Sequence, residues 1–300
     1  MAEAARRPDY FIVGAPKCGT TAMDAYLKQH PDVFVPDAKE LHYFGRDLVM
    51  NRHRDSLEEY LARFEGGADC ARAGEASVWY LWSRTAAAEI KAFDPDARIV
   101  IMLRDPVEVM YSQHSQAIVN GLGDEDIYDF AEALAAEPDR AAGRRVPKVC
   151  TFADGLRYRA IVRYTEQVAR FFESFGRDQV HVIIFDDFRA DTPAVYRDLL
   201  SFLGVDADFQ ADLEVVNANQ VVRSPRLRKA QALIPGRLKG LVPDAPRRAV
   251  RGALSRMNIS YQKRAPMDPA LRDQLKRELA GDVESLSELL GRDLTHWSQA

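Results

Sequence analysis

The stretch YFIVGAPKCGTT, residues 10–21, decides the fold of this chain. An apolar run leads into a turn that carries Gly14 and Gly19, and two threonines follow. A strand, a glycine-containing turn and a helix in this order aim backbone N–H groups and the positive helix end at an anion. In the Walker A pattern G-x-x-x-x-G-K-[ST] the lysine follows the second glycine, whereas Lys17 lies inside the loop. The stretch therefore predicts an anion-binding turn that differs from a Walker A loop.

Apolar runs of this kind alternate with helical patterns along the chain. The clearest strand-like runs are Tyr10–Val13, Arg98–Leu103 and Val180–Phe185, and a turn and a helix follow each. Short, nearly all-apolar strands are typical of a sheet covered on both faces. Helices are expected over about 20–29, from 106 to the turn at 121–123, over 156–175 and over 192–204. The pattern predicts an α/β fold with a central, mainly parallel sheet flanked by helices.

Other segments are less regular. Residues 137–154 have little periodicity and are expected to form a loop, and the Arg- and Pro-rich region of about 205–265 is expected to hold at most short helices. From Pro266 onward, two helical patterns cover 268–281 and 282–291. Since no linker divides the chain, we expect one domain over residues 1–300.

Composition narrows the class of protein. The chain has 300 residues, 47% of them hydrophobic, and a formal net charge of −4, which does not favour nucleic acid or a membrane surface as a partner. No stretch approaches the ~20 apolar residues of a membrane span.

Cys18, Cys70 and Cys150 are an odd number without C-x-x-C spacing, so reduced thiols are expected rather than disulfides or a zinc site. The few polar residues before the first strand do not form a signal peptide. A cytoplasmic protein is predicted.

The loop PKCGTT resembles the 5′-phosphosulfate loop of sulfotransferases, which use 3′-phosphoadenosine 5′-phosphosulfate (PAPS). The resemblance implies the P-loop-like three-layer α/β fold of that family. It also implies that the 5′-phosphate is held by Lys17, Cys18, Gly19, Thr20 and Thr21. Lys17 would reach the bridging oxygen, where negative charge grows as the sulfuryl group leaves. Because a sulfuryl group carries less charge than a phosphoryl group and no Walker B pattern is evident, we expect no metal requirement.

A second match lies in RIVIMLRDPVEVMYSQ, residues 98–113. Arg104 ends a buried strand, and Ser112 lies on the helix that follows Pro106. In sulfotransferases an arginine and a serine so placed hold the 3′-phosphate of PAPS, and the planar fork of arginine suits phosphate oxygens. Taken alone, the segment favours a surface pair of Arg104 with Asp105 and a solvent-facing Ser112; the phosphate-binding interpretation gains its support from the loop upstream.

Three further segments resemble the heparan-sulfate-type and related bacterial sulfotransferases: KELHYFG at 39–45, GEASVWYLW at 74–82 and the closing LLGRDLTHW at 289–297. The resemblance implies that Glu40 is the catalytic base. His42 could orient Glu40, contact the acceptor or act as the base itself. In an extended segment the two side chains would share one side, whereas a salt bridge of Glu40 with Lys39 is the structural alternative.

Other candidates have weaker support. Glu75 and Ser77 could support the site from a neighbouring segment, while Cys18 and His114 are expected to be structural. The R-K-G phosphate motif of the small cytosolic branch is absent, and its nearest substitutes are Arg223, Arg226 and Arg228.

Together these features predict a PAPS-dependent sulfotransferase that transfers a sulfuryl group directly, in line, to a hydroxyl or amine. The acceptor would be a small molecule or a carbohydrate, and the oligomeric state stays open. A kinase or NTPase with a degenerate P-loop and a non-catalytic nucleotide-binding protein are the alternatives.

Overall fold

The computed structural model describes residues 6–120, 123–214, 220–222, 259–261 and 264–299. The chain forms two compact units, and each is described by itself. The first unit comprises residues 1–109, 161–217 and 272–300, and the second comprises 110–160 and 218–271. Much of the predicted Arg- and Pro-rich region, including Arg223, Arg226 and Arg228, lies outside the described residues.

The first unit is built on a five-stranded sheet in the order β2-β3-β1-β4-β5. Its strands are β1 (Tyr10–Gly14), β2 (Val33–Phe34), β3 (Arg72–Ala76), β4 (Arg98–Leu103) and β5 (Val180–Ile184). All neighbouring strands are parallel, and Tyr10 pairs with Gly74 on one side and with Arg98 on the other. Gly74 is required there, because a Cβ would lie 2.3 Å from the Tyr10 carbonyl oxygen. The predicted parallel sheet is confirmed.

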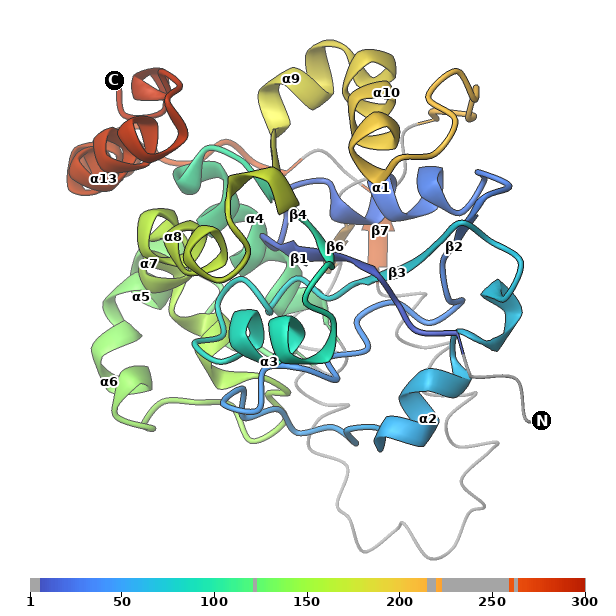
Figure 1. Cartoon of the computed structure of the whole chain (residues 1–300). Coiled ribbons are helices and arrows are strands. Elements are labelled where there is room, and N and C mark those ends of the chain that lie inside the picture. Colours follow the sequence, from blue (N-terminus) through green and yellow to red (C-terminus); the bar gives the residue numbers. More distant parts are fainter. Residues whose placement is uncertain (1–5, 121–122, 215–219, 223–258, 262–263, 300) are drawn as a thin grey trace, which may run out of the picture. The chain divides into compact units, whose positions relative to one another are not determined.

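Helices cover both faces of this sheet (Figure 1). On one face lie α1 (Thr20–Leu27) and α10 (Thr192–Leu203), joined where the Tyr196 hydroxyl donates to the Tyr26 carbonyl across 3.1 Å. On the other lie α3 (Ala86–Phe93) and α8 (Tyr164–Phe175). Every residue of β1 is buried, as is every residue of β4 after Arg98. These strands are apolar throughout because neither face meets water.

Several predicted boundaries are wrong. The helix expected over 156–175 is interrupted: a 3₁₀ turn η2 (Ala153–Leu156) and α7 (Tyr158–Ile161) precede α8. The helix restarts at Tyr164, whose N–H donates to the distant Asp282 carboxylate across 3.1 Å. The strand expected over Val180–Phe185 ends one residue early, because Phe185 begins α9 (Phe185–Ala190).

Two irregular predictions also change. The expected loop at 137–154 contains α6 (Glu137–Ala141). The two patterns at 268–291 form one continuous helix, α13 (Pro269–Leu290). Gly281 does not end this helix, because a glycine in a helix interior costs only about 1 kcal/mol relative to alanine. The remaining elements are α2 (Leu57–Ala62), η1 (Glu65–Gly67), α4 (Pro106–Val119), α5 (Phe130–Ala135), η3 (Arg177–Gln179), η5 (Thr295–Trp297), β6 (Gln220–Val222) and β7 (Ile259–Tyr261).

The second unit has its own buried centre. Arg140 and Glu125 form an ion pair of 2.7 Å in which both side chains are fully buried. The other carboxylate oxygen of Glu125 accepts from the Tyr158 hydroxyl at 2.7 Å. The strands β6 and β7 of this unit pair antiparallel. Among the described residues of both units, no helix is long and apolar enough to cross a membrane.

Candidate active site

The sheet order brings three segments of the first unit to one edge. The chain passes from β1 to β2 and β3 on one side of β1, and then to β4 on the other. In open α/β sheets, ligands bind beyond the carboxyl ends of the strands where the order reverses in this way. Here that edge holds the loop 14–19 after β1, Ser77 after β3 and Arg104 after β4.

The loop after β1 has the backbone of an anion-binding turn. Lys17 and Gly19 adopt left-handed conformations, with φ of 66° and 91°. Gly19 is the N-cap of α1, which has neither a side-chain cap nor an acidic residue in its first turn. An anion can therefore supply the partner that the N-terminal N–H groups require. Thr20 begins the helix and is buried, whereas Thr21 is exposed.

Cys18 is a packing residue of this loop. The thiol is fully buried and donates to the Pro16 carbonyl oxygen across 3.4 Å. Burial raises the pKa of Cys18 to about 12. A thiol with such a pKa stays neutral, so it is a poor nucleophile.

Arg104 is bonded directly to the loop. Its guanidinium donates to the Lys17 carbonyl oxygen at 3.4 Å and pairs with Glu108 at 3.5 Å. Its Cζ lies 4.7 Å from the ring centroid of Phe185, at the start of α9. Arg104, which the sequence assigns to the 3′-phosphate, is thus bonded to the backbone of the loop at Lys17.

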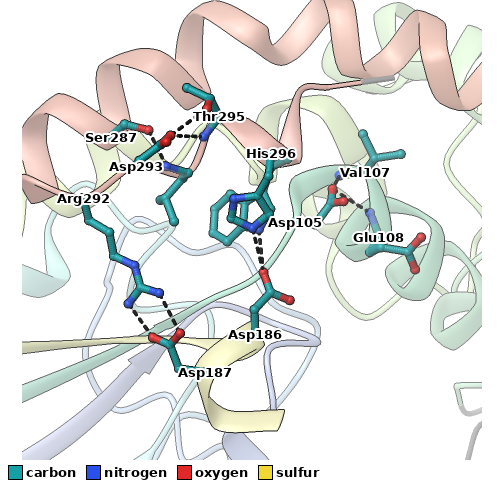
Figure 2. A network of polar contacts seen from close by, with 12 residues as sticks. Asp105, Val107, Glu108, Asp186, Asp187, Ser287, Arg292, Asp293, Thr295 and His296 are labelled. Carbon is teal, nitrogen blue, oxygen red and sulfur yellow. Dashed lines mark hydrogen bonds and ion pairs between the residues drawn. The ribbon is translucent and has the colours of Figure 1, made fainter. Parts of the chain in front are cut away.

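The neighbouring Asp105 has a different role. Its carboxylate accepts from the backbone N–H groups of Val107 at 2.8 Å and Glu108 at 3.4 Å, and so caps α4 (Figure 2). The alternative of an Arg104–Asp105 surface pair is not what the structure has.

Two aromatic rings of α9 lie behind the loop. A Cβ on Gly19 would come within 3.1 Å of the Phe188 ring and 3.2 Å of the Phe185 ring. Only glycine fits between these rings and the loop without a shift. Sequence reasoning missed this contact, since it treated Phe185 as the last residue of a strand.

The C-terminal segment 292–297 holds α9 in turn (Figure 2). Asp186 accepts from the Trp297 indole N–H at 2.8 Å and lies 3.2 Å from the His296 ring nitrogen. Asp187 forms a two-point ion pair with Arg292. The closing part of LLGRDLTHW therefore supports α9. Because Phe185 and Phe188 of α9 pack against Gly19, the same segment also supports the loop indirectly.

Glu40 and His42 come together, although not as expected. Both have left-handed backbones, with φ of 63° and 51°, so the segment is not extended and the condition under which the two side chains would share one side is not met. The Glu40 N–H donates to the Ala76 carbonyl at 3.1 Å, and the His42 N–H donates to the Ser77 hydroxyl oxygen at 3.0 Å. These bonds fold the segment over the end of β3 and place His42 Nε2 3.2 Å from Glu40 Oε2.

Glu75 anchors this arrangement from inside. Its buried carboxylate accepts from the hydroxyls of Ser77 at 2.6 Å, Tyr60 at 2.9 Å and Tyr80 at 2.8 Å. Burial raises the pKa of Glu75, and these hydrogen bonds oppose the rise. Because Ser77 donates to Glu75, its oxygen is turned to accept from His42. Glu75 and Ser77 thus support the site from β3.

Both oxygens of Glu40 are engaged. Lys39 Nζ lies 2.6 Å from Oε1, while Oε2 accepts from the Val78 N–H at 3.0 Å and faces His42. Burial alone would raise the pKa of Glu40, but the contacts of His42 and Lys39 lower it to about 2. Lys39 Nζ also donates to the Thr20 hydroxyl at 3.5 Å. The predicted alternative, a Lys39–Glu40 salt bridge, is therefore present.

A cavity of about 360 Å³ lies beside His42. Its walls are His42, Arg46, Leu48, Val49, Met50, Arg52, His53 and Arg54. Arg52 donates to the Glu40 carbonyl oxygen at 2.6 Å, so this wall also fixes the backbone of Glu40.

The comparisons with known proteins agree with this geometry. The family model of the sulfotransferase domain matches residues 7–226. This chain belongs to the sulfotransferase family. The crystal structure of a sulfotransferase from Alicyclobacillus acidocaldarius superposes with a TM-score of 0.75 at 30% identity, covering 98% of this chain and 100% of that one. The predicted P-loop-like fold and the predicted sulfotransferase family are confirmed, and the kinase alternative is not favoured.

Two curated relatives match smaller parts of this chain. Carbohydrate sulfotransferase 15 of Mus musculus is 25% identical over an alignment of 246 residues, and the match covers 66% of this chain and 44% of that protein. Heparan sulfate glucosamine 3-O-sulfotransferase 3B1 of Homo sapiens is 32% identical over 113 residues, or 37% and 27% of the two chains. This sulfotransferase thus spans less than half the length of the curated relatives it matches.

Two further residues that the sequence of this sulfotransferase singles out, Ser112 and His114, belong to the second unit. Ser112 is half-buried on α4. His114 is buried in that unit; its ring nitrogen lies 2.9 Å from the Ile127 carbonyl oxygen, and burial lowers its pKa. These contacts fit the structural role predicted for His114.

Among the described residues, His53, Asp55 and Glu59 bring ligand atoms within 4.8 Å of one another. Asp55 is paired with Arg63 at 3.1 Å, and Glu59 completes the capping box of α2. Their contacts are accounted for by local structure.

Proposed function

We propose that this sulfotransferase uses PAPS as its donor and a hydroxyl or amine of a small molecule or carbohydrate as its acceptor. The observation that carries the proposal is the bond from the Arg104 guanidinium to the Lys17 carbonyl, which ties a cationic side chain to the loop that leads into the uncapped start of α1. This arrangement fits a phosphate-bearing ligand, since the first N–H groups of α1 have no side-chain cap and no acid lies in the first helical turn. PAPS would supply an activated sulfuryl group.

Each predicted donor-side residue then has a role. The 5′-phosphate would be held by Lys17, Cys18, Gly19, Thr20 and Thr21, with Cys18 contributing through its backbone. Arg104 and Ser112 would hold the 3′-phosphate. Lys17 would stabilise the negative charge on the leaving oxygen, a task for a preorganised cation.

On the acceptor side, Glu40 would take the proton of the attacking group. As the acceptor oxygen or nitrogen forms its bond to sulfur, the bond from sulfur to the 5′-phosphate oxygen breaks. His42 would orient the carboxylate through Nε2, since its Nδ1 is buried and has no hydrogen-bond partner among the described residues. The cavity lined by Arg46 and Arg52 would admit the acceptor.

Substitution of Glu40 tests the acceptor side. Glu40→Gln keeps the size and removes the basicity, so single-turnover transfer should fall by about two to four decades. Binding of 3′,5′-adenosine bisphosphate should be almost unchanged. Glu58→Gln, on the exposed face of α2, is the matched control. If transfer by Glu40→Gln stays within about threefold of the parent enzyme, Glu40 is not the base and His42 becomes the candidate.

We further propose that no metal is required, because Lys17 and the loop amides neutralise the leaving group. Transfer should then be equal with and without EDTA. Activity that is lost on chelation and restored by Mg²⁺ would overturn this proposal.

Residues 1–300 would act as one domain, and limited proteolysis that releases an active fragment would contradict this. A cytoplasmic location is consistent with the unpaired Cys18, Cys70 and Cys150 and is testable by cell fractionation.

A further inference from the structure

Lys39 connects the two sides of the proposed site. Its side chain is 19% exposed, and its ammonium lies 2.6 Å from Glu40 Oε1. The same ammonium reaches the Thr20 hydroxyl at 3.5 Å, at the first residue of α1. One flexible cation therefore spans the proposed base and the loop proposed for the 5′-phosphosulfate.

The groups that face Lys39 are mostly acidic. Besides Glu40, Asp24 on α1 interacts with the Lys39 ammonium, and Glu75 on β3 acts in turn on Asp24. Burial raises the pKa of Asp24 to about 6, with the Lys39 ammonium opposing the rise and Glu40 adding to it. Lys28 also faces Asp24, and His42 faces the far oxygen of Glu40.

The resting contacts of Glu40 do not suit a base. Oε1 is occupied by Lys39, and Oε2 by the Val78 N–H and His42. A base must bring a free oxygen within hydrogen-bond reach of the proton that it abstracts. Val78 contributes a backbone N–H, and His42 is buried, so neither leaves easily. Lys39 is the partner with a long side chain and a second contact nearby.

Building on the proposed function, we propose that Lys39 exchanges Glu40 for the anionic sulfuryl end of the bound donor, so that Glu40 becomes free to act as base only when the donor is in place. No covalent bond forms or breaks in the exchange, and no proton moves. The freed Oε1 then accepts the acceptor's proton during transfer. The donor is thereby required before the acceptor can react.

The test compares the binding affinities of two nucleotides, measured by calorimetry in the absence of acceptor. PAPS carries the sulfuryl group, and 3′,5′-adenosine bisphosphate lacks it. Lys39→Gln should weaken the binding of PAPS about tenfold or more, which is the loss expected for one charge-assisted bond. The affinity for the bisphosphate should change by less than about threefold. Lys39→Arg should restore most of the PAPS affinity. Lys28→Gln, which removes a neighbouring exposed ammonium, is the matched control and should leave both affinities unchanged.

Glu40→Gln should change the affinity for PAPS in the opposite direction to Lys39→Gln. Without the carboxylate, Lys39 is already released, so PAPS should bind several-fold more tightly than to the parent enzyme. Equal losses for both nucleotides in Lys39→Gln, or no loss for either, would overturn the exchange while leaving the proposed function intact. Failure of the parent enzyme to bind PAPS would overturn the proposed function itself. If Lys39→Gln does not fold, the Glu40→Gln affinity alone decides, and an unchanged value counts against the exchange.

Discussion

The guanidinium of Arg104 donates to the backbone carbonyl of Lys17 across 3.4 Å and so joins the end of β4 to the loop after β1. The residue proposed for the 3′-phosphate therefore also fixes the residue proposed for the bridging oxygen. Phe185 supports the other face of the guanidinium. A change at Arg104 should accordingly affect nucleotide selectivity and loop position together.

Nucleotide selectivity is the first prediction. The parent enzyme should bind 3′,5′-adenosine bisphosphate more tightly than 5′-AMP by one to two decades or more, since each charge-assisted bond contributes about 1.5–3 kcal/mol. Arg104→Ala should remove most of this preference, as measured by calorimetry. Arg197→Ala, at an exposed position on α10, is the control. Equal affinities of the parent enzyme for the two nucleotides would contradict the assignment of Arg104.

The second prediction concerns Lys17. Lys17→Ala should lower kcat by about two to three decades, the usual loss for one group that stabilises transition-state charge. Single-turnover transfer from PAPS measures the effect, with Lys276→Ala on α13 as the control. A change confined to KM would show that Lys17 only binds the ground state.

The third prediction separates the two contacts of the C-terminal segment with α9. Trp297 is 2% exposed, so Trp297→Ala should lower the free energy of unfolding by about 3–5 kcal/mol. The Arg292–Asp187 pair is 44% exposed on each side, and Arg292→Ala should cost no more than about 1 kcal/mol. Urea titrations measure both values. A larger cost for Arg292→Ala would show that the ion pair, and not the indole, holds α9.

The buried pair of the second unit gives the fourth prediction. Glu125→Gln leaves the Arg140 charge buried without its counter-ion, so the unfolding free energy should fall by about 3–5 kcal/mol. The double variant Glu125→Leu with Arg140→Met should lose less, because neither charge remains to be desolvated. Thermal unfolding of the two variants compares them. A double variant less stable than Glu125→Gln would contradict this account.

The fifth prediction is a pH dependence. Burial raises the pKa of Asp24 from 3.8 to about 6, so the folded protein holds this proton more tightly than the unfolded chain. Below about pH 4, Asp24 is protonated in both states and does not lower the free energy of unfolding. This free energy decreases as the pH rises from there to about 6. Asp24→Asn should therefore be about 1–3 kcal/mol more stable than the parent at pH 8, with little difference at pH 4. The control is the exposed Asp178→Asn. An equal increase in the stability of Asp24→Asn at pH 4 and pH 8 would exclude the titration of Asp24 as the cause.

The sequence predicts the centre of the sheet better than its edge. The strands β1, β4 and β5 are short, nearly all-apolar runs, and their pattern indicates burial on both faces. The strands β2 and β3 were not predicted, since Val33–Phe34 is only two residues long and Arg72–Ala76 has no β-branched or aromatic residue. The place of β3 depends on its pairing with β1, where Gly74 admits the neighbouring backbone, and the place of β2 depends on its pairing with β3.

The candidate site shows the same limit. The segments that hold Lys17, Glu40 and Arg104 could be recognised from their motifs. Their contacts could not, because Glu40 and His42 meet through left-handed backbones that depend on bonds to β3. The link from Lys39 to Thr20 also arises only when two separate loops fold together.

The support of the loop by α9, and of α9 by residues 292–297, has a consequence for biosynthesis. The ribosome makes the loop before residues 292–297, so the newly made loop lacks this backing until those residues have been added and folded. A nascent or truncated polypeptide that stops before Arg292 would carry every residue of the loop yet hold it loosely. Such a chain should therefore bind an anion at the loop more weakly than a chain that includes residues 292–297.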